Sequence, residues 1–146
     1  MQSESVGHGK GVPLYDSSSE AVTNNVRVEV SSQYAPYFAF AQPFQQQWLF
    51  HYTVRITNEG HERVKLVTRH WIITDATGHV EEVRGAGVVG EQPVLRPGES
   101  FQYTSGCPLK TKTGVMRGTY QMATANGDRF DVQIAPFALH EPYTVH

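Results

Sequence analysis

The sequence has little cysteine, no long apolar run and almost no net charge, and each absence excludes a class of protein. Cys107 is the only cysteine among 146 residues, so no intrachain disulfide can form, which fits a reducing compartment. No apolar run approaches the ~18 residues of a membrane-spanning helix. Met1 to Gly11 lacks the apolar segment of a secretory signal. We therefore expect a cytoplasmic protein that does not insert into a membrane.

The net charge of −2 does not suit a general binder of nucleic acid, because phosphate backbones usually select a basic surface. We do not expect a nucleic acid among the partners. A chain of this length forms one domain and buries roughly 68–70% of its extended surface, so it needs neither a disulfide nor a metal to hold a core.

A helical apolar period is also missing, since no 3.6-residue repeat continues for ~10 residues. Apolar and polar residues alternate instead, with apolar residues on both faces of one segment, and predict strands over residues 26–31, 48–57, 64–74, 80–83, 101–105, 116–122 and 130–134. Turn signals separate these segments, and Asn126-Gly127 is typical of a two-residue type I′ hairpin. The pattern predicts an all-β fold, an antiparallel β-sandwich of about seven or eight strands.

Two aromatic residues indicate where the core of this predicted sandwich lies. Trp71 and Tyr120 occupy positions along the chain where immunoglobulin-like sandwiches have a core Trp and a late Tyr. We expect Trp71 to be buried against the apolar face formed by Phe50, Tyr52 and Val54. Residues 1–23 are polar and lack periodicity, which predicts a mobile N-terminal tail before a domain of residues 24–146.

The segment Gly85-Ala86-Gly87-Val88-Val89-Gly90 has the glycine spacing of a dinucleotide-binding loop. That mode needs a helix whose N-terminal amides bind pyrophosphate, and Glu91-Gln92-Pro93 prevents a helix from starting here. Two interpretations stay open: glycines that an irregular connection requires for positive φ, or a loop that contacts a partner or an anion. The candidate partner-binding loop comprises Arg84, Gly85, Gly87, Val88, Val89, Gly90 and Glu91.

No other pattern predicts a catalytic, metal or cofactor site. The seven histidines form no HExxH or Cys/His cluster. Cys107 lies between Gly106 and Pro108, outside any nucleophile elbow, and is expected to be structural. The basic residues Arg27, Arg55, Lys65 and Arg69 are interpreted as outward-facing, solubilising charges on strands.

Several ordered segments resemble the bacterial ApaG proteins: residues 69–75, residues 83–93, Pro97-Gly98-Glu99, residues 103–106 and Phe130-Asp131-Val132. The resemblance covers roughly residues 26–139 and implies a fibronectin-type-III-like sandwich. It also implies a link to cobalt and magnesium tolerance or efflux and to the genetic neighbourhood of diadenosine-polyphosphate metabolism. Related domains in eukaryotic F-box and DNA-polymerase-interacting proteins look like interaction modules.

Together these observations predict a non-enzymatic binding module for a protein partner, whose identity the sequence does not give. The predicted contact surface is the loop from Arg84 to Gln92 with the adjacent edge strand. The alternative is a small-ligand site at the Gly85–Gly90 loop, for a nucleotide polyphosphate or a divalent cation. A monomer and an edge-strand dimer are both compatible with the sequence.

Overall fold

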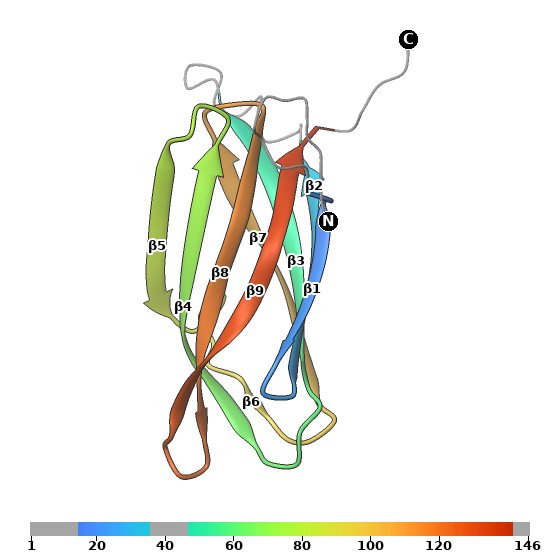
Figure 1. Cartoon of the computed structure of the whole chain (residues 1–146), viewed down its shortest axis with the longest axis vertical. Helices are drawn as coiled ribbons and strands as arrows, with labels where there is room; N and C mark the ends of the chain where they lie inside the picture. Colours follow the sequence, from blue (N-terminus) through green and yellow to red (C-terminus); the bar gives the residue numbers. More distant parts are fainter. Residues whose placement is uncertain (1–14, 36–46, 142–146) are drawn as a thin grey trace, which may run out of the picture.

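The computed structural model describes residues 15–35 and 47–141, and these form strands and turns without a helix (Figure 1). The strands are β1 (Ser18–Thr23), β2 (Val26–Tyr34), β3 (Trp48–Asn58), β4 (Val64–Asp75), β5 (Val80–Ala86), β6 (Val94–Leu95), β7 (Ser100–Leu109), β8 (Thr113–Thr124) and β9 (Arg129–His140). Every pairing among them is antiparallel.

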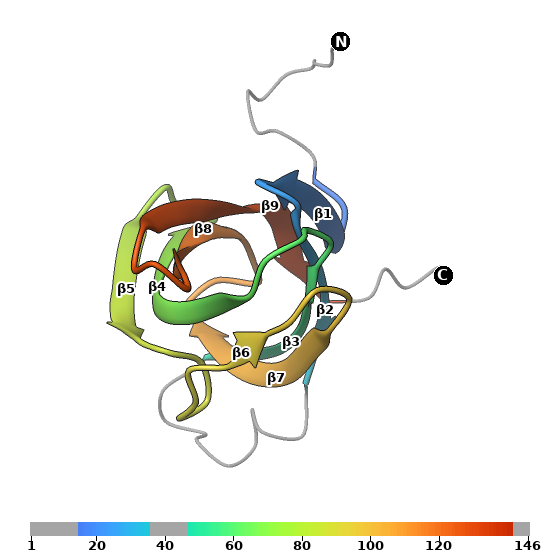
Figure 2. The ribbon, with the colours of Figure 1, turned by 90° about the horizontal axis from the view of Figure 1, so that it is seen from below.

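The strands form two sheets that face each other (Figures 1 and 2). The first sheet has the order β1-β2-β3-β7, and the second has the order β5-β4-β8-β9, with β6 paired to β4. The prediction of an all-β antiparallel sandwich is confirmed. The sequence analysis did not predict β1 or β6.

The core lies between the inner faces of the two sheets. Along β3, Phe50, Val54 and Ile56 are fully buried while His51, Thr53 and Arg55 between them are not, as the alternating pattern predicted. Trp71 is 2% exposed, and its ring lies 5.1 Å from that of Tyr52 and 6.4 Å from that of Tyr120. The predicted burial of Trp71 in the core is therefore confirmed.

One side of the sandwich is closed by contacts between β1 and β9 (Figure 2). Ser19 Oγ donates to the carbonyl of Ala135 at 2.7 Å, and the amide of Ala138 donates to the carbonyl of Asp16 at 2.7 Å. The prediction that the mobile tail extends to Thr23 is wrong for Ser18–Thr23, because these residues pair with β2. The domain therefore begins before the predicted boundary at Asn24, and the prediction for residues 1–14 concerns residues outside those described.

Two type I′ turns occur at places that the sequence analysis did not name. Asn24 and Asn25 have φ of 47° and 64° and join β1 to β2. Val89 and Gly90 have φ of 43° and 83° within the loop after β5. The prediction of a type I′ turn at Asn126-Gly127 is wrong, because only Gly127 has positive φ there and Thr124 N donates to Asp128 O in a longer loop.

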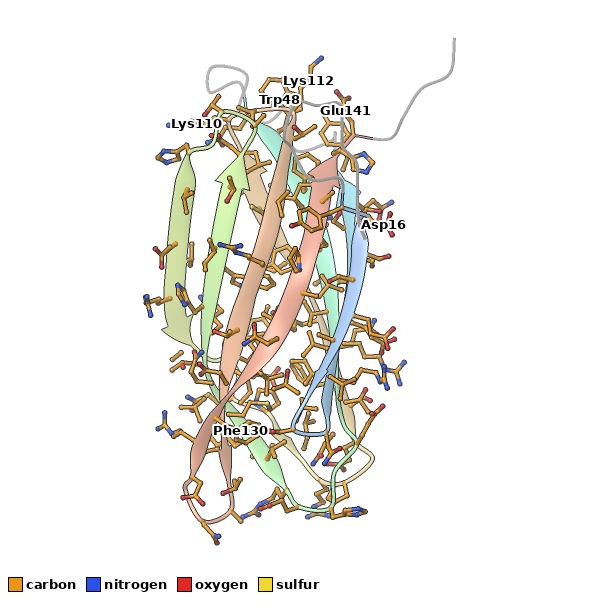
Figure 3. The ribbon with its side chains drawn as sticks, viewed as in Figure 1. Asp16, Trp48, Lys110, Lys112, Phe130 and Glu141 are labelled. Carbon is orange, nitrogen blue, oxygen red and sulfur yellow. The ribbon has the colours of Figure 1, made fainter. Side chains whose placement is uncertain are left out.

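The two ends of the sandwich carry different side chains (Figure 3). Trp48, Lys110 and Lys112 lie at the end where β7 turns into β8, and Phe130 lies toward the other end.

In the described ranges, 15–35 and 47–141, no helix is long and apolar enough to cross a membrane.

Candidate functional site

On the side of the sandwich opposite β1 and β9, described residues line a cleft of about 470 Å³. Within the described part of the chain, β5 pairs only with β4 and β7 pairs only with β3, so each has a free edge. Residues from both strands line the cleft. A cavity of this size, with mixed polar and apolar walls, is in the range that binds small ligands or side chains.

One wall of the cleft follows from alternation along β4 and β5. Arg69 pairs with Gly85, Trp71 with Val83 and Ile73 with Glu81, so all six face the same side of the second sheet. The cleft-lining set contains five of them, Arg69, Trp71, Ile73, Glu81 and Val83. One wall of the cleft therefore combines charged, hydrogen-bonding and apolar side chains.

The other wall comes from alternate residues of β7, with Tyr52 of β3 beside them. Tyr103, Ser105 and Cys107 line the cleft. The hydroxyls of Tyr103 and Tyr120 lie 2.5 Å apart in a buried hydrogen bond. Burial raises the pKa of both phenols, so both remain protonated at neutral pH.

The glycine-rich loop lines part of the cleft. Each of its three motif glycines occupies a position where a larger residue would be disfavoured, for a reason that differs between them. A Cβ at Gly85 would lie 2.8 Å from Nη2 of Arg69, and a Cβ at Gly87 would lie 2.1 Å from the carbonyl oxygen of Glu91. Gly87 and Gly90 also have positive φ. Val88 N donates to Glu91 O at 2.8 Å, and Glu91 N donates back at 2.9 Å, which makes a tight turn. The requirement for positive φ therefore applies to Gly87 and Gly90, and not to Gly85.

Val89 stands at the tip of this turn in a strained conformation. Its φ is 43°, a region that β-branched residues rarely adopt, and the side chain is 52% exposed at the cleft. Val88 is 1% exposed and belongs to the hydrophobic core. In the free domain, Val89 is therefore the exposed one of the two valines, while Val88 lines the cleft from the core.

The remaining predicted loop residues do not line the cleft. Arg84 is exposed beside Glu82, which also contacts His70 Nε2 at 2.7 Å. These residues alternate with the cleft-facing ones and so lie on the outer face of the second sheet. Glu91 is exposed and takes part in the turn through its backbone. The structure thus brings Val88, Val89 and Gly90 to the cleft but not Arg84 or Glu91.

Arg69 is a cleft residue that the sequence analysis misplaced, since it was interpreted as an outward-facing charge. Its Nη1 donates to the carbonyls of Ala86 and Gly87 at 3.0 and 2.9 Å, which holds the start of the loop. Among the described residues, the guanidinium forms no ion pair with a carboxylate. The alternation of Arg69 with Trp71 two residues later was the signal that could have placed it inside.

Trp71 presents a second donor without an acceptor. Its indole lines the cleft, and Nε1 is buried with no hydrogen-bond partner in the described part of the protein. Buried indole N–H groups usually have a partner. Among the described residues, the cleft wall therefore contains a buried N–H group without an acceptor and a guanidinium without a carboxylate partner.

Cys107 also lines the cleft, but it is poorly suited to nucleophilic chemistry. Burial, with a smaller effect of Glu81, raises the pKa of the thiol to about 12. A thiol that stays protonated at neutral pH is a weak nucleophile. In residues 15–35 and 47–141, no group of three His, Cys, Asp or Glu side chains could hold a metal ion.

The architecture and its cleft define an all-β sandwich domain, and comparison with known proteins identifies its family. Residues 39–124 match the family model described as the ApaG domain. The Protein ApaG of Rhodopseudomonas palustris strain TIE-1 is 54% identical over 122 residues, which cover 84% of this chain and 92% of that protein. The Protein ApaG of Bordetella pertussis strain Tohama I is 53% identical over 122 residues, which again cover 84% of this chain and 92% of that protein.

A solved structure agrees with this assignment. The crystal structure described as that of an ApaA protein from Bordetella pertussis matches with a TM-score of 0.76 and 49% identity, covering 90% of this chain and 100% of that one. The chain belongs to the ApaG family, as its sequence resemblance implied.

Proposed function

We propose that this chain is a non-enzymatic binding domain that recognises an extended segment of a partner protein in the cleft between β5 and β7. The observation that carries the proposal is Val89, an exposed apolar side chain held in a strained turn at the cleft. Strain of this kind costs roughly 1–3 kcal/mol, and residues that carry it cluster at binding sites and other functional sites.

The free edge of β7 supports an extended segment as the ligand. An edge strand presents unpaired amides and carbonyls, to which a partner strand can add. A segment added to β7 would extend the first sheet opposite the inner face of β5, where Glu81 and Val83 line the cleft. Alternate side chains of the added strand would thereby point into the cleft between the two sheets.

A non-enzymatic role agrees with the chemistry of the cleft. The thiol of Cys107 and the phenols of Tyr103 and Tyr120 all have raised pKa values, so none is poised to transfer a proton near neutral pH. The reduced, buried cysteine also fits the cytoplasm, which we propose as the compartment.

The test places a photo-crosslinking amino acid at Val89 in the native host. Val22 on β1 is the matched control position, because it is 49% exposed, close to the 52% of Val89, but lies on the closed side of the sandwich. We expect a partner to crosslink from position 89 and not from position 22. The Val89→Asn variant keeps the turn and should lose affinity for that partner in a titration with the purified proteins.

Two results would contradict the proposal. One is a partner that crosslinks equally from both positions, and the other is full affinity in Val89→Asn. A crosslink from position 89 to a second copy of this chain would identify an edge-strand dimer instead.

The second candidate ligand is a small anion in the same cleft. The guanidinium of Arg69 favours it, because Arg69 has no carboxylate partner among the described residues. A nucleotide polyphosphate is opposed by Glu81 in the lining and by Glu91 beside the loop, and β6 follows the loop where a phosphate-binding helix would be needed. Calorimetry with a diadenosine polyphosphate tests this candidate. Saturable micromolar binding that Arg69→Gln abolishes would favour it.

The ApaG resemblance implies a role in cobalt and magnesium tolerance. We propose that the domain exerts any such role through its protein partner rather than by binding a cation itself. Titration of the purified domain with Mg²⁺ or Co²⁺ should then give no saturable heat. Stoichiometric binding of either cation would contradict this part of the proposal.

A further inference from the structure

One wall of the cleft contains a buried donor without an acceptor and a guanidinium without a carboxylate partner among the described residues. Nε1 of Trp71 has no partner, although Trp71 is only 2% exposed. The half-buried guanidinium of Arg69 donates from Nη1 to two neutral carbonyls and has no carboxylate within ion-pair distance among the described residues. Desolvated charges and buried N–H groups are costly when they lack a partner.

The two donors belong to the same wall. Arg69 and Trp71 are two residues apart on β4, so their side chains project from the same face of the sheet, and both residues line the cleft. The wall opposite carries the hydroxyl of Ser105 and the ring of Tyr52, which add polar and aromatic surface to the cleft.

We propose that this wall is a receptor for a single carboxylate, carried by an acidic side chain of the partner segment and bound by the guanidinium of Arg69 and the indole N–H of Trp71. This inference rests on the proposed function, because the acidic side chain enters from the segment that adds to β7. A carboxylate has two acceptor oxygens, one for each donor, and charge-assisted hydrogen bonds of this kind are strong.

The charge of Glu81 favours a ligand with one negative charge over a ligand with several. It is exposed at the cleft on β5, and it pairs with Ile73 across the sheet. Its repulsion is tolerable for one carboxylate that Arg69 neutralises, but it grows with each further charge on the ligand. The cleft therefore selects a carboxylate over a polyphosphate.

The experiment follows the two indole N–H signals in ¹H–¹⁵N spectra of the ¹⁵N-labelled full chain, since Trp48 and Trp71 are its only tryptophans. The probes are a capped pentapeptide, acetyl-Thr-Val-Glu-Val-Thr-amide, and its central Gln isostere. Sodium propionate and inorganic tripolyphosphate are the small-molecule probes. We expect the Glu peptide to shift the Trp71 signal and to bind about tenfold or more tightly than the Gln peptide.

Variants at the cleft separate the carboxylate site from general peptide binding. Arg69→Gln and Trp71→Phe should each weaken the Glu peptide about tenfold, with the dispersion of the amide spectrum reporting that the fold is retained. Glu81→Gln should tighten it several-fold. Glu82→Gln is the matched control, because Glu82 is the neighbouring exposed carboxylate but contacts His70 and Arg84 on the outer face, and it should change nothing.

Several outcomes would overturn the inference. They are equal binding of the Glu and Gln peptides, no shift of the Trp71 signal by any carboxylate, tripolyphosphate binding more tightly than the Glu peptide, and propionate binding as tightly as that peptide. The last would identify a small carboxylate rather than a partner segment as the ligand. A partner that still crosslinks from position 89 under any of these outcomes would leave the proposed function standing without the carboxylate receptor.

Discussion

The guanidinium of Arg69 occupies the space that a side chain at Gly85 would need. A Cβ built on Gly85 would lie 2.8 Å from Nη2 and 2.9 Å from Cζ of Arg69, its partner across the β4–β5 ladder. The same guanidinium donates to the carbonyls of Ala86 and Gly87. One cross-strand contact therefore fixes the cleft wall and the start of the glycine-rich loop together.

Gly85→Ala should displace the Arg69 side chain and release the loop. The atoms that a Cβ would meet are the flexible end of Arg69, so the loss should come from its hydrogen bonds to the loop and be about 1 kcal/mol in the free energy of unfolding. Urea denaturation measures it. Gly106→Ala is the control, because a Cβ there would meet its nearest atom at 3.7 Å, an ordinary contact. Equal stability of the two variants would show that Arg69 moves aside at no cost.

Val89→Asn should stabilise the domain. Asparagine tolerates the left-handed region that type I′ turns require, whereas valine at φ 43° is strained. Removing the strain should raise the free energy of unfolding by about 1 kcal/mol. A thermal melt that moves downward for this variant would mean that packing of the Val89 side chain outweighs its backbone strain.

Removing residues 1–23 should destabilise the domain, because β1 pairs with β2 and also bonds to β9. Several lost hydrogen bonds at about 1 kcal/mol each predict a loss of roughly 2 kcal/mol or more. Differential scanning calorimetry compares this truncation with one that removes residues 1–14 only. A melting temperature that is the same for both truncations would show that β1 contributes nothing.

Cys107 should resist thiol reagents in the folded protein. Burial raises the pKa of its thiol to about 12, so almost no thiolate forms at pH 8. Ellman's reagent should therefore label the protein only on unfolding in urea, with one equivalent per chain. Rapid labelling under native conditions would contradict both the burial and the expected inertness of this residue.

Asp75 should make stability depend on pH at the β4–β5 turn. Hydrogen bonds from the Thr77 hydroxyl, and then from the amides of Thr77 and His79, lower the pKa of the carboxyl. Its contribution to stability is therefore fully present above the ordinary Asp pKa of 3.8 and is lost as pH falls through the lower pKa of the folded state.

The matched variant is Asp75→Asn, which keeps a carbonyl acceptor but removes the charge. Its melting temperature should lie below that of the wild type at neutral pH, and the difference should shrink in acid. A difference that grows on acidification would reverse the predicted sign.

Alternation in the sequence predicted the strands with the strongest burial, and the reason is local. Along β3 each second residue is apolar, so the chain itself marks the inner face. Trp71 and Tyr120 were placed in the core by their positions along the chain, which match those of the core Trp and late Tyr of immunoglobulin-like sandwiches. By contrast, β1 has no fully buried residue, and β6 has only two residues. β6 is held by β4, which lies far before it in the chain, and β1 is held by its hairpin with β2 and by hydrogen bonds to β9, so neither strand needs an alternating buried face.

The candidate site was predicted in part. The loop was found through its glycines, and positive φ explains Gly87 and Gly90. The need for a glycine at position 85 arises from the register that places it opposite Arg69, which one strand alone does not reveal. Arg69 was misplaced for a related reason, since a charged residue in an alternating strand usually faces water.

The contacts between β1 and β9 leave the sandwich with only one side to which a strand can add. On the closed side, Ser19 Oγ and Ser32 Oγ donate to the carbonyls of Ala135 and Ala138, which joins the two sheets. On the other side, β5 pairs only with β4 and β7 pairs only with β3 among the described residues. The stoichiometry expected for a bound segment is therefore one per domain.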